Sequence, residues 1–145
     1  MVIQRIQTLY LLLVAVLMGI FAFLPVIGAN VDGNALAIGA LGTCGVTQPS
    51  WLLFCLDALV VVLALIAIFK FKDLKGQMRL CGVMLLLLVA LLACIAVIFV
   101  GQRGQCTAVL QWPIALPLVA MVFTMLARKG IKHDRKLLSD SERIR

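Results

Sequence analysis

Charged residues are scarce in this chain of 145 residues: Asp, Glu, Lys and Arg together make up 13%, and there are only six acids and one histidine. Hydrophobic residues make up 64%, and the mean hydropathy is +1.17. A water-soluble core cannot absorb so much apolar surface, so this composition excludes an ordinary soluble domain. We expect residues 1–145 to form a single membrane domain.

Motifs that carry chemistry are also missing. His133 is the only histidine, so a metal site would lack a second imidazole, and Ser50 is expected on the opposite side of the membrane from it. The cysteines include no C-x-x-C pair, which an enzyme that makes disulfides would need. We therefore predict no catalytic, cofactor-binding or metal-binding residue and do not expect an enzyme. A membrane thiol/disulfide enzyme is the third interpretation of function.

Four apolar runs are each long enough to cross about 30 Å of hydrocarbon, which takes about 20 helical residues. They predict an all-α membrane protein, an antiparallel bundle of four transmembrane helices. The first run exceeds the usual apolar core of a signal peptide and no A-x-A site follows it directly, so we expect it to be retained. The predicted spans are residues 9–27, 51–69, 80–101 and 109–127, with external loops at 28–50 and 102–108, a cytoplasmic loop at 70–79 and a cytoplasmic tail at 128–145.

Basic residues are concentrated on one side of these spans. One precedes the first span, four lie in the 70–79 loop and seven follow the fourth span, so Arg103 alone lies on the other side. The positive-inside rule then predicts a multi-pass membrane protein with both termini and the 70–79 loop in the cytoplasm. The basic tail has no interleaved aromatics, so we expect it to lie near anionic lipid head groups and not to bind nucleic acid.

Turn and helix-breaking residues predict the shape of the loops. The segment Val31-Asp32-Gly33-Asn34 is typical of a type I′ hairpin turn, so the first external loop is predicted to form a small cap with a β-hairpin. Pro117 is predicted to kink the fourth helix, and Gly130 to break it. After Gly130, apolar residues recur every seven positions, which predicts an amphipathic interfacial helix; a solvated, partly disordered tail is the alternative.

Asp57 is the one acid inside a span. It lies about 9 Å below the outer interface, at a depth where a bare carboxylate costs about 2 kcal/mol or more, so it must have a partner, be protonated or face water. One interpretation is an ion site in a small proton- or cation-coupled transporter. The other is a structural carboxylate that caps loop atoms or pairs with Arg103. An open cavity at Asp57 would favour transport, whereas a sealed carboxylate would favour the structural role.

The five cysteines divide between loops and spans. Cys44 and Cys106 fall one in each external loop, which predicts a disulfide between the loops in an oxidising compartment, with Cys55 as a rival partner. Cys81 and Cys94 are predicted to be core residues.

The two ends of the chain carry a more specific pattern than the spans. The chain opens Ile3-Gln4-Arg5-Ile6-Gln7-Thr8-Leu9-Tyr10-Leu11-Leu12-Leu13 and closes Leu126-Ala127-Arg128-Lys129-Gly130-Ile131-Lys132, then Asp134, Lys136-Leu137, Ser139 and Glu142-Arg143-Ile144-Arg145. This pattern resembles a four-helix membrane family of Bacteroidota, domain-of-unknown-function family 4293. The resemblance spans the full length and implies an inner-membrane protein with no assigned activity.

Both ends are predicted on the cytoplasmic side, where they would form one surface that docks a partner or locks the bundle closed. Arg5 is expected to pair with Asp134, Asp140 or Glu142. The leading interpretation of function is therefore a non-enzymatic accessory or assembly subunit of a membrane complex. The predicted docking residues are Gln4, Arg5, Gln7, Tyr10, Arg128, Lys132, Arg143 and Arg145.

Overall fold

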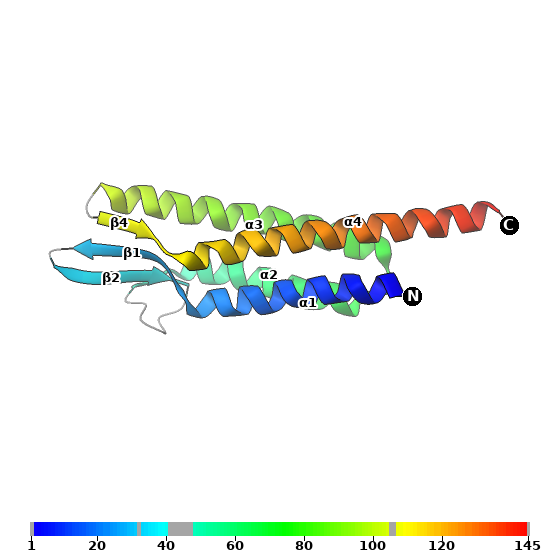
Figure 1. The fold of residues 1–145 in the computed structure, drawn as a ribbon, viewed down its shortest axis with the longest axis horizontal. Helices are drawn as coiled ribbons and strands as arrows, with labels where there is room; N and C mark the ends of the chain where they lie inside the picture. Colours follow the sequence, from blue (N-terminus) through cyan, green and yellow to red (C-terminus); the bar gives the residue numbers. More distant parts are fainter. Residues whose placement is uncertain (1, 32, 41–47, 105–106, 145) are drawn as a thin grey trace.

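The computed structural model describes residues 2–31, 33–40, 48–104 and 107–144. Four long helices lie side by side, with a small sheet at one end and both ends of the chain at the other (Figure 1). We call the first the sheet end and the second, which holds residues 5–10, 70–79 and 128–144, the basic end. The helices are α1 (Val2–Phe23), α2 (Trp51–Phe69), α3 (Leu74–Arg103) and α4 (Ala115–Arg143), the last preceded by a 3-10 turn, η1 (Trp112–Ile114).

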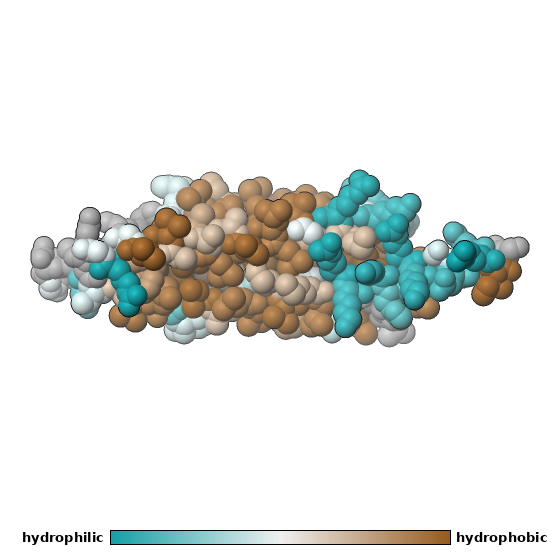
Figure 2. All heavy atoms as spheres, turned by 90° about the horizontal axis from the view of Figure 1, so that it is seen from above, coloured by the Kyte–Doolittle hydropathy of each residue, from teal (hydrophilic) through white to brown (hydrophobic). Residues whose placement is uncertain are grey.

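All four helices are long and apolar enough to cross a membrane. Apolar side chains cover the middle of the molecule, and polar side chains gather toward the basic end (Figure 2). The prediction of a four-span, all-α membrane protein is confirmed.

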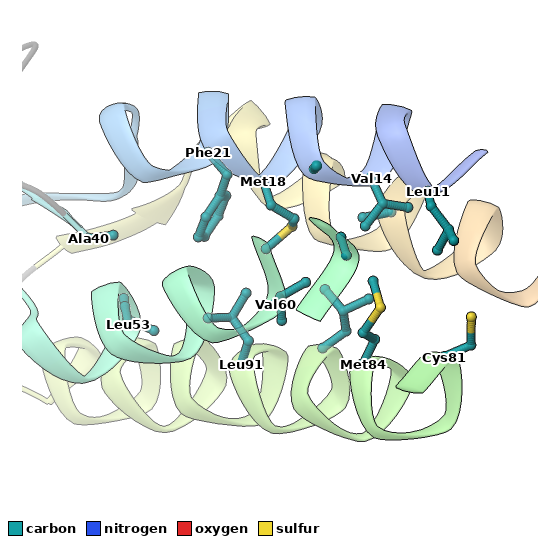
Figure 3. Close-up of a cluster of buried hydrophobic side chains, with 14 of the residues drawn as sticks. Leu11, Val14, Met18, Phe21, Ala40, Leu53, Val60, Cys81, Met84 and Leu91 are labelled. Atoms are coloured by element: carbon teal, nitrogen blue, oxygen red, sulfur yellow. The ribbon is translucent and has the colours of Figure 1, made fainter. Parts of the chain in front are cut away.

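The helices form a closed ring, because each packs on its neighbours in chain order and α4 packs back on α1. The buried side chains of α1 point across the ring toward those of α2 and α3 (Figure 3). Apart from Ala15 and Ala22 in α1, the buried positions of each helix alternate in steps of three and four residues, the spacing of a left-handed helical bundle. These positions are Gln7, Leu11, Val14, Met18 and Phe21 in α1; Leu53, Asp57, Val60, Ala64 and Ala67 in α2; Gln77, Cys81, Met84, Leu88, Leu91 and Ile95 in α3; and Pro117, Ala120, Thr124, Ala127, Ile131 and Asp134 in α4.

The sheet contains the predicted hairpin and more. Strands β1 (Pro25–Val31) and β2 (Asn34–Gly39) pair antiparallel, with Val31 opposite Asn34, so the hairpin turn lies between these two residues, where the sequence predicts it. Gly33 has φ +83°, a conformation that favours glycine. Two further strands, β3 (Gln48–Pro49) and β4 (Thr107–Leu110), complete the order β3-β2-β1-β4. The sheet thus joins both loops of this end.

Several predicted span boundaries differ from the structure. Helix α1 ends at Phe23 and not at residue 27, because Pro25 disfavours helical backbone at the residue before it and begins β1 instead. Helix α4 begins only at Ala115, because residues 109 and 110 pair in β4. Most of the predicted 70–79 loop is helical, since α3 begins at Leu74.

Neither of the predicted helix breaks in α4 occurs. Pro117 is the third residue of the helix, within the first turn, where a backbone N–H has no helical acceptor to lose. Gly130 lies inside one continuous helix that runs on to Arg143. The tail therefore continues the direction of α4 beyond the other helices and does not turn aside as a separate interfacial helix (Figure 1).

Candidate functional site

Buried polar side chains mark the places where the bundle departs from simple apolar packing. In the described part of the chain these are Gln7, Gln77, Thr124, Asp134 and Asp57. Gln77 Nε2 donates a hydrogen bond of 3.2 Å to the carbonyl of Ala67, which ties α3 to α2. Thr124 Oγ1 donates one of 2.7 Å to the carbonyl of Ala120 in its own helix. These two groups are satisfied, as buried polar atoms usually are.

Gln7 and Asp134 join the first helix to the last at the basic end. Gln7 Nε2 donates a hydrogen bond of 2.5 Å to Asp134 Oδ2, across 127 positions of sequence. Gln7 is 2% exposed and Asp134 is 8% exposed. A hydrogen bond to a carboxylate in such a site is stronger than one between neutral groups. This pair closes the seam between α1 and α4.

Arg5 does not take the role that the sequence suggested for it. In the structure it is exposed, and no ion pair joins it to Asp134, Asp140 or Glu142, which are all described residues. The physical reason is the face that each residue occupies: Gln7 continues the buried positions of α1, whereas Arg5 lies off them. The predicted partner of Asp134 was therefore wrong, although the contact between the two ends of the chain is present.

Gly130 allows α1 to approach α4 at this point. A Cβ atom built on Gly130 would lie 3.2 Å from both Cγ and Nε2 of Gln7. Such a distance is short for two non-bonded heavy atoms, and the Gln7 amide cannot retreat without lengthening its bond to Asp134. Close packing against Gln7 therefore favours glycine at this position inside the helix.

We predict that Gly130→Ala lowers the stability of the protein when residue 7 is glutamine and raises it when residue 7 is alanine. In a helix interior alanine is favoured over glycine by about 1 kcal/mol, but the contact with Gln7 should more than cancel this gain. In a Gln7→Ala background, which removes Cγ, the same substitution should stabilise the protein. Thermal unfolding of the four variants in detergent measures both effects. Stabilisation by Gly130→Ala in both backgrounds would contradict the contact.

The predicted docking surface divides into an interior and an exterior part. Gln7 is interior. Tyr10 is half-buried, and its ring stacks on that of Phe123 with centroids 5.9 Å apart. Arg5, Arg128, Lys132 and Arg143 are exposed. The side chain of Gln4 and the whole of Arg145 lie outside the described residues.

The last part of α4, together with Ile144 directly after it, forms an exposed arm, which we define as residues 135–144. Every side chain of this arm is exposed, including three apolar ones, Leu137, Leu138 and Ile144, the last at 87%. Leu138 also continues the spacing of the buried positions of α4, four residues after Asp134. The arm therefore carries the packing face of the helix past the point where the bundle covers it.

Asp57 is the exception among the buried polar groups. It is 1% exposed, between Leu53 and Val60 on the inward face of α2, and its Oδ1 makes no hydrogen bond with any described residue. Figure 3 shows that Leu53 and Val60 face Phe21, Met18 and Leu91 in the apolar interior. The carboxyl is sealed from solvent, with one oxygen unpaired.

Arg103 does not reach Asp57. Its guanidinium carbon lies 5.3 Å from the ring centroid of Phe99 on its own helix, and no ion pair links it to Asp57 in the described part of the chain. The register of the α2–α3 hairpin explains this. Gln77 lies at Ala67, so Asp57 is level with about residue 87 of α3, and Arg103 is about 24 Å farther along the helix. The predicted pair of Asp57 and Arg103 is thus not formed.

The predicted disulfide cannot be placed, because Cys44 and Cys106 lie outside the described residues. Of the other cysteines, Cys55 is exposed, Cys81 is buried and Cys94 is half-buried, and each is a free thiol. Cys81 is thus a core residue, as predicted, and Cys94 packs against the core.

A family model described as a domain of unknown function, DUF4293, matches residues 3–144. The chain belongs to this family. The match includes both terminal segments on which the resemblance was based. No curated protein and no solved structure matches the chain. Membership of DUF4293 assigns no activity, so function has to be argued from the geometry of this chain.

The spacing of this DUF4293 chain contained a signal that sequence reasoning missed. Gln7 lies four residues before Leu11, and Asp134 lies three after Ile131, so both continue the alternating pattern of their helices. Gln77 stands in the same relation to Cys81. Polar residues that extend a buried pattern in steps of three and four are candidates for interior contacts between helices.

Proposed function

We propose that this protein is a non-enzymatic accessory or assembly subunit of a membrane complex, which docks a partner protein through the arm of α4. It would lie in a bacterial inner membrane with both termini in the cytoplasm. The charge distribution supports this orientation, because the exposed bases of residues 70–79 and 128–143 gather at one end of the apolar band (Figure 2).

The observation that carries the proposal is the exposure of every side chain in the arm, residues 135–144, which is one continuous helix as far as Arg143. An isolated helix of this length is marginal in water, so a surface that covers Leu137 and Leu138 would stabilise it. The arm projects beyond the other helices (Figure 1) and away from the apolar band (Figure 2), which favours a protein surface over the bilayer as the cover of Leu137 and Leu138. An amphipathic helix with exposed leucines fits a groove on another protein.

The Gln7–Asp134 contact supports the same interpretation, because it holds the base of the arm against α1. A helix that is fixed at its base loses less conformational freedom when its free end binds. The arm is thereby presented in one direction relative to the membrane.

The test is purification of the tagged protein from its own membranes in mild detergent, with quantitative mass spectrometry of the proteins that accompany it. The test variant is Leu137→Ser/Leu138→Ser, and the matched control on the same arm is Ser139→Ala/Ser141→Ala. A companion protein should be recovered in a constant ratio with the wild type and the control, and at least about tenfold less with the leucine variant. Equal recovery with both variants, or no companion, would contradict the proposal.

The second candidate function is a small proton- or cation-coupled transporter that uses Asp57. The unpaired, buried Oδ1 favours it, because intramembrane acids commonly mark ion pathways. The 1% exposure of Asp57 weighs against it, since an ion needs an aqueous route to the carboxyl. The accessory role is therefore preferred.

A further inference from the structure

A groove of about 560 Å³ runs along the seam between α1 and α4 at the basic end. Tyr10 of α1 forms one side of it. The other side comes from α4 and includes Leu126, Lys129, Lys132, His133 and Lys136. The groove is distinct from the arm leucines, since neither Leu137 nor Leu138 lines it.

The chemistry of the polar part of the groove favours a phosphate. Three lysines line it and no acid does. Lys129, His133 and Lys136 are separated by four and three residues, so they lie on one face of α4. Asp134, the nearest acid in the sequence, is buried and bonded to Gln7, and among the described residues it makes no ion pair with a groove lysine. The lysine charges are available to an anion.

The other part of the groove is apolar and leads toward the membrane-facing surface. Tyr10 is held in place by its stack on Phe123, and Leu126 lies beside it. Farther along the same two helices, Leu13 and Val122 are exposed, within the apolar stretches long enough to span a membrane. A ligand that fills the whole groove therefore needs an anionic head and a hydrocarbon tail.

We propose that this groove binds an anionic phospholipid. The head-group phosphate would lie among Lys129, Lys132 and Lys136, and one acyl chain would follow Tyr10 and Leu126 toward the apolar band. The polar and apolar parts are joined in the order that a lipid in the adjacent leaflet presents them. A nucleic acid or a soluble acidic peptide would leave the apolar part empty.

The experiment is native mass spectrometry of the purified protein in detergent, with phosphatidylglycerol or phosphatidylcholine of the same acyl chains added. The groove variant replaces Lys129, Lys132 and Lys136 with glutamine. The matched control replaces Lys70, Lys72 and Lys75 with glutamine, which removes the same charge at the same end but outside the groove. The wild type and the control should bind phosphatidylglycerol about tenfold more tightly than phosphatidylcholine, and the groove variant should lose this preference.

A further variant separates loss of charge from loss of fold. Replacement of the same three groove lysines with arginine keeps the charge and should keep the preference. Equal loss in the control variant would mean general attraction to the basic end and would overturn the proposal. So would competition by inorganic phosphate as strong as by the lipid, because the ligand would then be a free anion. A wild type with no preference would also overturn it.

Discussion

Replacing Gln7 with alanine is expected to destabilise the bundle by about 2 kcal/mol, because it leaves the Asp134 carboxylate buried without its donor. Asp134 is 8% exposed and accepts the Gln7 amide at 2.5 Å. A buried charge that loses its partner pays the full cost of its desolvation. The decrease in the free energy of unfolding should thus exceed the packing contribution of the methylene and amide groups that the substitution removes.

Thermal or chemical unfolding in detergent measures this effect, with Leu9→Ala as the control on the same helix. Leu9 is exposed and lies off the buried face, so its truncation should cost little. The variant Gln7→Leu/Asp134→Leu, which makes both partners apolar, should recover most of the lost stability. A Gln7→Ala variant no less stable than Leu9→Ala would show that the contact does not close the seam.

Replacing Asp57 with leucine is expected to stabilise the protein by about 1–3 kcal/mol, the usual cost of an unpaired buried polar group. Its Oδ1 has no partner among the described residues, and its neighbours on α2 are Leu53 and Val60. Leucine would extend that apolar surface. Asp57→Asn keeps two polar atoms in the same place, so it should gain less.

The measurement is the unfolding of the wild type, Asp57→Leu and Asp57→Asn in the same detergent. An Asp57→Leu variant less stable than the wild type would mean that the carboxyl is hydrogen-bonded.

The Asp57→Leu variant also separates the two candidate functions. An accessory subunit should recover its companion protein unchanged with leucine at position 57. A transporter that uses Asp57 should instead lose ion flux in proteoliposomes, whatever its stability.

Features set by local composition could be predicted from the sequence. The four spans follow from the length of the apolar runs, and the hairpin follows from Asp32 and Gly33, since both signals lie within a few residues. The addition of β4 could not be foreseen, because it pairs Ile27 with Leu110 across the chain. That pairing also shifted the start of the fourth helix, which cannot begin while residues 107–110 are extended.

The candidate site was predicted in its location and not in its contacts. The charge pattern of the sequence predicted that the two ends of the chain lie together, and they do. The contact between them differs from the prediction, because Gln7 and not Arg5 bonds to Asp134. The choice depends on which face of α1 is buried, and that is set by α2 and α4. Asp57 was likewise recognised, whereas its separation from Arg103 depends on the register of two helices. Gly130 does not end the helix, since α4 runs on to Arg143. Its role is to leave room for the Gln7 side chain, which packs directly against it.

The most direct test of the docking arm is site-specific photo-crosslinking in native membranes. A photoreactive residue would replace Leu138 on the arm, and in a second protein Leu86, which is exposed in the apolar part of α3. The account predicts one discrete cross-linked product with another protein from position 138 and none from position 86. No product from position 138, or the same products from both positions, would contradict the claim that the arm docks a partner.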